Sequence, residues 1–264
     1  MSEVSEHPAG TPSWIDLGTP DIEAAVGFYG GLFGWDAPEA ENAAETGGYR
    51  LATLRGKPVA GLMPLMQEGQ PPAWSTYVSV DDADEVTRKV KDAGGQIVAE
   101  PMDVMDLGRM ALFTDPTGAF FGVWQPRSFA GAGIVNEAAS LSWNELDTRD
   151  PDAAKGFYTA VFGWEARDFD MGEGGSYVTW HRNGEERGIG GMMDIRGRVP
   201  DEIPANWLVY FAVDDTDATA AKARELGGTV AVEPTDIPDV GRFAVLTDPH
   251  GAAFAVIQNT NPSD

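Results

Sequence analysis

The stretch TPSWIDLGTPDIEAAVGFYGGLFGW, residues 11–35, decides the fold, because it returns as SLSWNELDTRDPDAAKGFYTAVFGW, residues 140–164. Every shared residue recurs at the same spacing of 129 positions. In the first copy the shared residues are Trp14, Thr19, Asp21, Gly27, Phe28, Tyr29, Phe33, Gly34 and Trp35. Such self-similarity indicates a duplicated structural unit and sets the architecture before any local feature does.

The repeat continues downstream with a spacing of 133 positions. The segment from Tyr77 to Asp82 returns from Tyr210 to Asp215, and the turn Asp115-Pro116-Thr117-Gly118 returns from Asp248 to Gly251. We therefore predict two copies of one domain of ordinary size. The expected parts are a disordered tail (1–12), a first domain (13–125), a linker (126–140), a second domain (141–258) and a second tail (259–264).

Punctuating residues within each copy predict an α+β fold. Asp21 is a favourable N-cap for a helix from about 22 to 33, and Gly34 is a favourable C-cap. Before and after these helices lie short segments in which apolar and polar residues alternate, as is typical of strands. Each half therefore reads as two βαβββ units.

The composition limits the classes of partner. Forty-two acidic and 18 basic residues give a formal net charge of −24, which disfavours nucleic acid and anionic membrane surfaces. The chain has no cysteine, which excludes disulfides and thiolate chemistry. No apolar run is long enough to span a bilayer, and the first residues do not resemble a signal peptide. We expect a soluble, cytoplasmic monomer or homodimer.

The order of these motifs resembles the vicinal-oxygen-chelate superfamily, which includes glyoxalase I, extradiol dioxygenases and bleomycin-resistance proteins. The resemblance rests on Asp21, Phe28-Tyr29, Val80-Asp81-Asp82, Gly94-Gly95 and the Asp115–Gly118 turn, all of which recur. Among two-domain members the chain is similar to the actinobacterial glyoxalase-like proteins that are often labelled hydroxylases. The resemblance implies the paired βαβββ fold, in which each half forms a curved sheet around one cup.

The resemblance also implies where a divalent metal would bind. Metal-using relatives place His, Gln and Glu ligands at three strand positions of each cup. The matching positions in this chain are Trp14, Ser75, Gly122, Trp143, Leu208 and Ala255. These side chains offer no set of imidazole or carboxylate donors, so we predict neither a metal at these positions nor a cofactor. The three histidines, His7, His181 and His250, are interpreted as surface residues.

Strand alternation indicates what lines the cups instead. If Trp14 and Trp143 face the cups, the next inward residues on the same strands are Asp16 and Glu145. Arg109 and Arg242 begin a nearby strand and can pair with these acids if they take the same face, which the sequence leaves open. The predicted ligand-binding residues are Trp14, Asp16, Ser75, Tyr77, Arg109, Trp143, Glu145, Tyr210 and Arg242.

Two interpretations of this set stay open at the level of sequence. It is either an internal polar brace, because a buried acid needs a partner, or a pocket for a small, partly aromatic or oxygen-rich molecule. Alternative functions are a glyoxalase- or hydroxylase-type enzyme of secondary metabolism or aldehyde stress, working without metal, and a non-catalytic interaction scaffold. Ser75 and Ser79 make the first cup the more polar one, so we expect it to bind polar ligands better than the second, where Leu208 and Ala212 stand.

Overall fold

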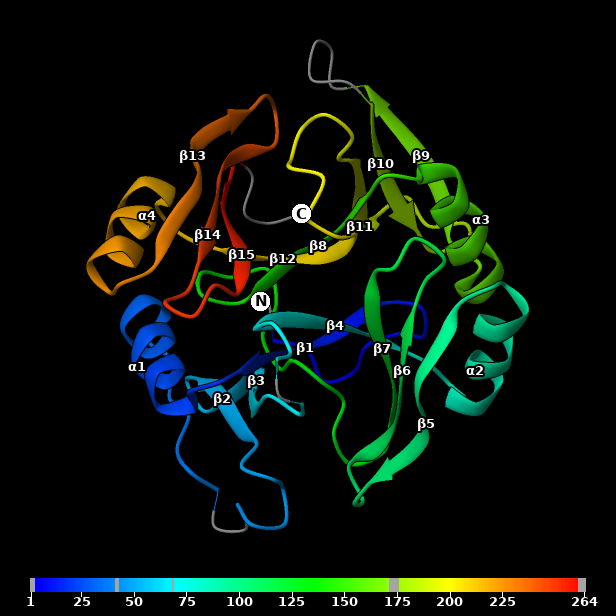
Figure 1. The fold of residues 1–264 in the computed structure, drawn as a ribbon, viewed down its shortest axis with the longest axis horizontal. Coiled ribbons are helices and arrows are strands. Elements are labelled where there is room, and N and C mark those ends of the chain that lie inside the picture. Colours follow the sequence, from blue (N-terminus) through cyan, green and yellow to red (C-terminus); the bar gives the residue numbers. More distant parts are fainter. Residues whose placement is uncertain (1–2, 41–42, 68, 171–175, 261–264) are drawn as a thin grey trace.

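The computed structural model describes residues 3–40, 43–67, 69–170 and 176–260, which form two curved sheets flanked by helices (Figure 1). The first half contains β1 (Pro12–Thr19), α1 (Ile22–Phe33), β2 (Arg50–Leu54), β3 (Lys57–Pro64), β4 (Ala73–Ser79), α2 (Ala83–Asp92), β5 (Gln96–Val104), β6 (Gly108–Thr114) and β7 (Phe120–Pro126). The second half contains β8 (Leu141–Thr148), α3 (Pro151–Phe162), β9 (Glu165–Asp170), β10 (Ser176–His181), β11 (Gly188–Asp194), β12 (Asn206–Ala212), α4 (Thr216–Glu225), β13 (Thr229–Ile237), β14 (Gly241–Thr247) and β15 (Ala253–Asn259).

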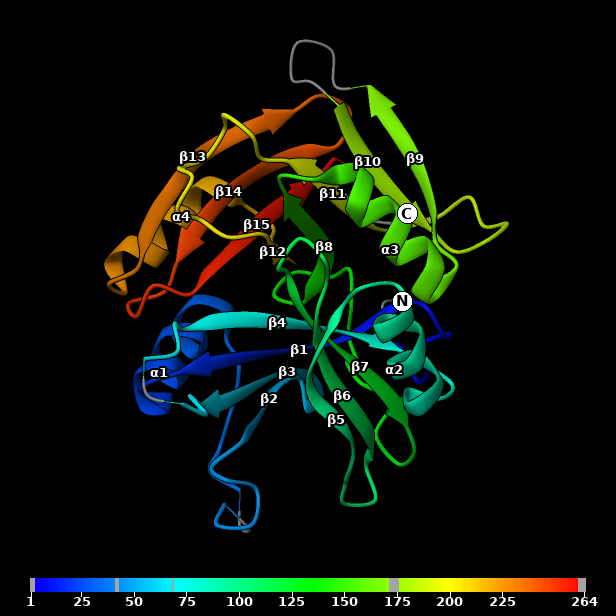
Figure 2. The same cartoon turned by 45° about the vertical axis from the view of Figure 1, so that its right-hand side comes forward.

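The strand order is equivalent in the two sheets. The first sheet has the order β2-β3-β1-β4-β7-β6-β5. Read from the equivalent edge, the second sheet has the order β9-β10-β11-β8-β12-β15-β14-β13. The central strands β1 and β4, or β8 and β12, run antiparallel, while each outer group joins them in parallel. This is the predicted duplication of paired βαβββ units, and each sheet curves around a concave face (Figure 2).

The first βαβββ unit is incomplete at its edge. In the second half, β9 and β10 form a hairpin at the edge of the sheet. At the equivalent place in the described part of the first half, an isolated bridge joins Asp36 to Thr53. The first sheet therefore has seven strands and the second has eight.

Residues at the helix ends satisfy the free backbone groups as the sequence predicts. The Asp21 side chain accepts a hydrogen bond from the Ala24 amide, and Asp150 accepts one from Ala153. Gly34 ends α1 with φ 72°, a left-handed conformation that favours glycine because it has no Cβ. The repeated Asp and Gly positions are thus the start and stop of equivalent helices.

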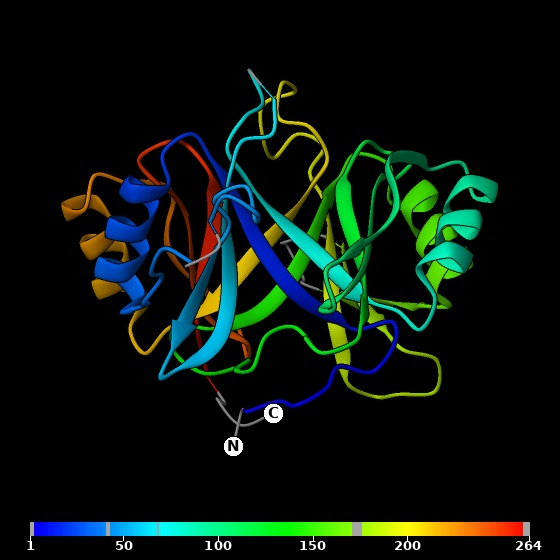
Figure 3. The ribbon, with the colours of Figure 1, turned by 90° about the horizontal axis from the view of Figure 1, so that it is seen from below.

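The two sheets pack back to back, with α1 beside α4 on one flank and α2 beside α3 on the other (Figures 1 and 3). As a result, both buried clusters between the sheets contain residues from both halves. In one, Phe33 of α1 lies 5.0 Å from Phe211 of β12 between ring centroids. In the other, Phe121 of β7 lies 5.7 Å from Tyr158 of α3. Each half therefore completes its core with the other half.

The segment before β1 differs from the expected disordered tail. The Gly10 amide donates to the Ser79 carbonyl, and the Trp164 indole donates to the Gly10 carbonyl at 2.8 Å. Residues 3–11 therefore lie against both halves, because their backbone groups satisfy donors and acceptors that would otherwise be unpaired. Residues 261–264 of the expected C-terminal tail lie outside the described residues.

The segment between the sheets is also packed rather than exposed. Ala132 and Ile134 are buried, and Ile134 belongs to the cluster shared by the two halves. Among the helices within the described ranges, none is long and apolar enough to cross a membrane.

Candidate functional site

The register of the first sheet places the predicted residues in two rows of its concave face. Trp14 pairs with Tyr77, and Tyr77 pairs with Gly122, so these three positions form one row. Asp16 pairs with Ser75 on one side and Gly61 on the other, which forms the next row. We call this face, with Trp14, Asp16, Tyr49, Tyr77 and Trp124, the N-terminal cup.

A tyrosine that the sequence analysis missed completes this row. Tyr49 accepts a hydrogen bond of 2.9 Å from the Trp14 indole. Its ring lies over Gly61, where a Cβ would come within 1.8 Å of the Tyr49 hydroxyl. The sequence repeat could have indicated Tyr49, because the tyrosine and the glycine that it covers recur in the second half as Tyr177 and Gly191.

Asp16 lies almost completely buried beneath these rings, with 5% of its surface exposed. Burial raises the pKa of Asp16 to about 7, against the opposing effect of hydrogen bonds from Tyr77 and Ser75. The carboxyl therefore keeps its proton to nearly neutral pH. It is held by hydroxyl groups rather than by a cation.

The second sheet repeats the arrangement with a longer acid. Trp143 pairs with Tyr210, and Glu145 pairs with Gly191 and Leu208. The Tyr210 hydroxyl donates to Glu145 Oε1 at 2.9 Å, and the Trp143 indole donates to the Tyr177 hydroxyl at 2.9 Å. Burial raises the pKa of Glu145, while hydrogen bonds from Tyr177 and Tyr210 lower it.

A second acid, which the sequence analysis did not count, lies on this face. Asp147 follows Glu145 by two positions on β8, so both side chains point to the same side. Burial, and then the neighbouring Glu145 charge, raise the pKa of Asp147 to about 8. Two carboxyls in one low-dielectric site share a proton more readily than they both ionise. We call this face, with Trp143, Glu145, Asp147, Tyr177, Tyr210 and Ile257, the C-terminal cup.

Apolar side chains form the walls and rims of both cups. The floor of the N-terminal cup is lined by Trp14, Tyr77, Leu112 and Trp124, and that of the C-terminal cup by Leu208, Tyr210, Ala255 and Ile257. At the rims, Leu51 and Met102 in the first sheet are 40% and 45% exposed, and Phe169 in the second is 47% exposed. A few polar groups in an apolar concave face are typical of a small-molecule site.

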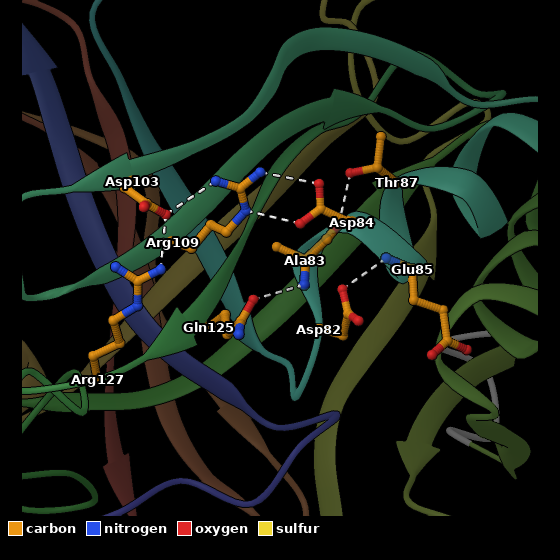
Figure 4. A network of polar contacts seen from close by, with 9 residues as sticks. All are labelled: Asp82, Ala83, Asp84, Glu85, Thr87, Asp103, Arg109, Gln125 and Arg127. Carbon is orange, nitrogen blue, oxygen red and sulfur yellow. Dashed lines mark hydrogen bonds and ion pairs between the residues drawn. The ribbon is translucent and has the colours of Figure 1, made fainter.

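The two predicted arginines lie elsewhere, which corrects the expectation that they line the cups with Asp16 and Glu145. Arg109 extends toward α2, where its guanidinium contacts Asp84 at 2.8 Å and Asp103 at 3.0 Å (Figure 4). Arg242 makes the equivalent ion pairs with Asp217 and Asp236. Arg109 shares its face of β6 with Ala111 and Phe113, which are buried between the sheets. Arg242 shares its face of β14 with Ala244 and Leu246 in the same way, so each arginine takes the face opposite the cup. Neither belongs to the site.

The histidines were interpreted as surface residues, and this interpretation is wrong for His181. Its side chain is 7% exposed, and its Nε2 lies 2.8 Å from the Thr179 hydroxyl. It lies beside Gly188, over which the Trp143 ring packs. His7 and His250 are half-buried, His7 because its ring contacts the Ala132 carbonyl at 2.9 Å.

Comparison with known proteins agrees with this geometry. The model of the glyoxalase/bleomycin resistance protein/dioxygenase superfamily matches residues 11–123 and 141–256. The chain belongs to this superfamily. It is 47% identical over 261 residues to "Putative glyoxylase CFP32" of Mycobacterium bovis, with 98% of each chain covered. It is 40% identical over 263 residues to "Anthracycline biosynthesis protein DnrV" of Streptomyces peucetius, covering 94% of this chain and 93% of that protein.

Solved structures of superfamily members share the fold at low identity. The Mn(II)-bound glyoxalase from Novosphingobium aromaticivorans superposes with a TM-score of 0.65 and 17% identity, covering 96% of this chain and 83% of that one. The 2,3-dioxygenase LapB from Pseudomonas sp. KL28 gives 0.66 and 12%, covering 96% and 94%. These likenesses establish the architecture of the superfamily member described here.

The residues present do not fit the divalent metal that such a superfamily fold implies. The first row of the C-terminal cup carries Trp143, Tyr210 and Ala255, and none of these has an imidazole or carboxylate donor. Within the described part of the chain, no three His, Cys, Asp or Glu side chains gather in a metal-binding group.

Proposed function

We propose that the protein binds a small hydroxylated aromatic molecule in the C-terminal cup. The observation that carries this proposal is the Glu145 carboxyl, which shares its face of β8 with Trp143 and accepts hydrogen bonds from Tyr210 and Tyr177. A carboxylate has about four lone-pair sites, so it can accept a further hydrogen bond from a ligand hydroxyl, and the indole offers an aromatic face or edge. Asp147 adds a second acceptor for a neighbouring hydroxyl.

The names of the relatives support an aromatic ligand of this kind. The proteins from Streptomyces are named for anthracycline biosynthesis, and an anthracycline contains fused planar rings with phenolic hydroxyl groups. The exposed Phe169 at the rim extends the apolar surface beyond the floor of the cup, as a fused-ring ligand requires. The relative from Mycobacterium bovis is named as a glyoxylase, and this name supports small oxygenated compounds as the alternative class of ligand.

The C-terminal cup, rather than the N-terminal one, is the better site for a polar ligand. The expectation from sequence favoured the N-terminal cup because of Ser75 and Ser79. In the structure the Ser79 hydroxyl donates to the His7 carbonyl at 3.0 Å, so it is occupied. The position of Asp147 in the other sheet is taken by Gly18 in the first. The C-terminal cup therefore has one acid more.

The proposal is tested by titrating the protein with 1,4-dihydroxyanthraquinone, catechol and the glutathione hemithioacetal of methylglyoxal. Binding is followed by calorimetry and by tryptophan fluorescence, which Trp143 reports. We expect saturable binding of the anthraquinone and about a tenfold weaker affinity for Glu145→Gln, because one hydrogen bond to a charged group is worth more than 1.4 kcal/mol. Tyr210→Phe should weaken binding in the same direction.

The matched control is Arg242→Ala, which removes a charged side chain from the same sheet but from its convex face. Its affinity should equal that of the unaltered protein. Equal affinity for Glu145→Gln, or the absence of saturable binding by all three compounds, contradicts the proposal. The second outcome favours the scaffold interpretation, in which the fold is kept for protein contacts.

A second candidate function is proton transfer without a metal, and the Glu145–Asp147 pair specifically favours it. A carboxyl whose pKa is raised to about 8 serves as a general acid at neutral pH, and its ionised neighbour serves as a base. The test is exchange of deuterium from D2O into an acidic C–H position of the bound compound. Exchange should be lost in Asp147→Asn while the affinity changes little.

A further inference from the structure

The N-terminal cup contains an aromatic ring from the chain itself. Phe129, in the segment that follows β7, stands edge to face against Trp14, with centroids 4.9 Å apart and planes at 88°. It also lies 6.0 Å from Trp124. Two hydrogen bonds fix the backbone of Phe129: the Trp124 indole donates to the Phe129 carbonyl at 2.8 Å, and the Phe129 amide donates to the Leu107 carbonyl at 3.1 Å.

The C-terminal cup has a counterpart of Trp14 but no aromatic residue at the sequence position equivalent to Phe129. At the repeat spacing, Trp143 matches Trp14, whereas Ile257 matches Trp124 and Pro262 matches Phe129. Pro262 lies outside the described residues, and a proline side chain has no aromatic ring whatever its position. The place that Phe129 occupies in the first cup therefore has no aromatic counterpart from the equivalent position in the second.

The exposed fractions of equivalent side chains support this difference between the cups. Leu107 and Ala99, which pack in the cluster around Phe129, are half-buried. Their equivalents in the second sheet, Val240 and Val232, are 37% and 40% exposed. Trp14 is 5% exposed, whereas Trp143 is only half-buried. Trp143 and these two wall residues are thus more exposed than their counterparts in the first cup.

We infer that Phe129 occupies an aryl subsite, and that the C-terminal cup receives an aromatic ring of the ligand at the equivalent place, edge to face against Trp143. One chain then binds one aromatic ligand, and the N-terminal cup is closed by its own phenylalanine. The inference rests on the proposed function only in taking the C-terminal cup as the ligand site. It defines the orientation of the ligand, with its ring against Trp143 and its hydroxyl groups toward Glu145.

The test uses toluene, which has the same ring and carbon substituent as the phenylalanine side chain, because a vacated apolar cavity binds such a molecule. In the full-length chain we expect one toluene per molecule, with nuclear Overhauser contacts to the indole of Trp143. In Phe129→Ala we expect two, the second contacting Trp14 and Trp124. Trp143→Ala should abolish the first site and leave the second site of Phe129→Ala intact.

The outcomes separate this inference from the proposed function. If toluene binds with these stoichiometries but no hydroxylated aromatic compound binds, the aryl subsite stands and the polar recognition is wrong. If the unaltered chain binds no toluene, or binds it against Trp14, the inference is overturned. A folded Phe129→Ala protein that gains no site overturns it as well. If Phe129→Ala does not fold, the toluene contacts of the unaltered chain and their loss in Trp143→Ala decide.

Discussion

Tyr158 in the second half of the chain donates a hydrogen bond of 3.0 Å to Asp115 in the first half. The reciprocal pair joins Tyr29 to Asp248 at 3.3 Å. In each case a buried tryptophan, Trp207 or Trp74, donates to the tyrosine hydroxyl. The repeated Phe-Tyr pair and the repeated Asp-Pro turn therefore meet across the two halves, and the halves interlock.

Removing one of these hydroxyl groups should destabilise the whole protein. Tyr158→Phe leaves the Trp207 indole without its acceptor and Asp115 Oδ2 without its tyrosine donor, both in a buried site. Asp115 Oδ1 keeps its hydrogen bonds from Thr117 and Ala119. We expect the free energy of unfolding to fall by about 1–3 kcal/mol. Urea denaturation measures it. Tyr29→Phe is the matched variant and should show a similar loss, and a stability unchanged in both variants would refute the interlock.

The interlock also predicts that neither half folds alone, although residues 13–125 and 141–258 read as two domains. A fragment of residues 1–126 would expose Phe28, Tyr29 and Phe33, which pack against Phe211 and Phe254. We expect each isolated fragment to lack a cooperative thermal transition by circular dichroism. Mixing the two fragments should restore it. A separate cooperative transition of either fragment would show that the cross-half contacts are dispensable.

The buried acids predict a loss of stability as the pH rises through the neutral range. The pKa of Asp16 is raised from 3.8 to about 7, so the folded chain holds a proton that the unfolded chain releases near pH 4. The contribution of Asp16 to the free energy of unfolding is therefore largest below pH 4. It falls by at most about 4 kcal/mol as the pH rises to about 7. Asp147, with a pKa of about 8, extends the window upward in the same direction.

Asp16→Asn should flatten this decline, because the amide is neutral at every pH. The free energy of unfolding is measured at pH 5 and pH 8 for the variant and the unaltered chain. Asp84→Asn is the control, because its ion pair with Arg109 lowers rather than raises the pKa of that acid. A decline that is equally steep in Asp16→Asn would mean that the buried carboxyl ionises without cost.

The donor set of the cups predicts a protein that works without a resident divalent ion. We expect elemental analysis of the purified chain to find no stoichiometric manganese, iron or zinc, because Trp143, Tyr210 and Ala255 cannot hold one. Treatment with a chelator should leave the affinity for the anthraquinone unchanged. One ion per chain whose removal abolishes binding would contradict this expectation and would place ligands outside the rows described here.

The sequence by itself determined the duplication and the order of the units. Periodic repeats identify equivalent units, and strand alternation puts Trp14 with Asp16, and Trp143 with Glu145, on one face. Asp147 was missed, although the same alternation applies two positions after Glu145. Tyr49 and Tyr177 were within reach of the repeat, since each faces a glycine that recurs with it.

Only the tertiary structure decided how the halves meet and which partners the two arginines take. The partners of Arg109 lie on a helix and on a neighbouring strand, and nothing local in the sequence says which face of its strand the arginine takes. The contacts of Tyr158 with Asp115, and of Phe129 with Trp14, join residues that are distant in the chain. Such contacts depend on the packing of whole sheets, because a side chain is buried by whatever surface the fold brings to it and not by its sequence neighbours.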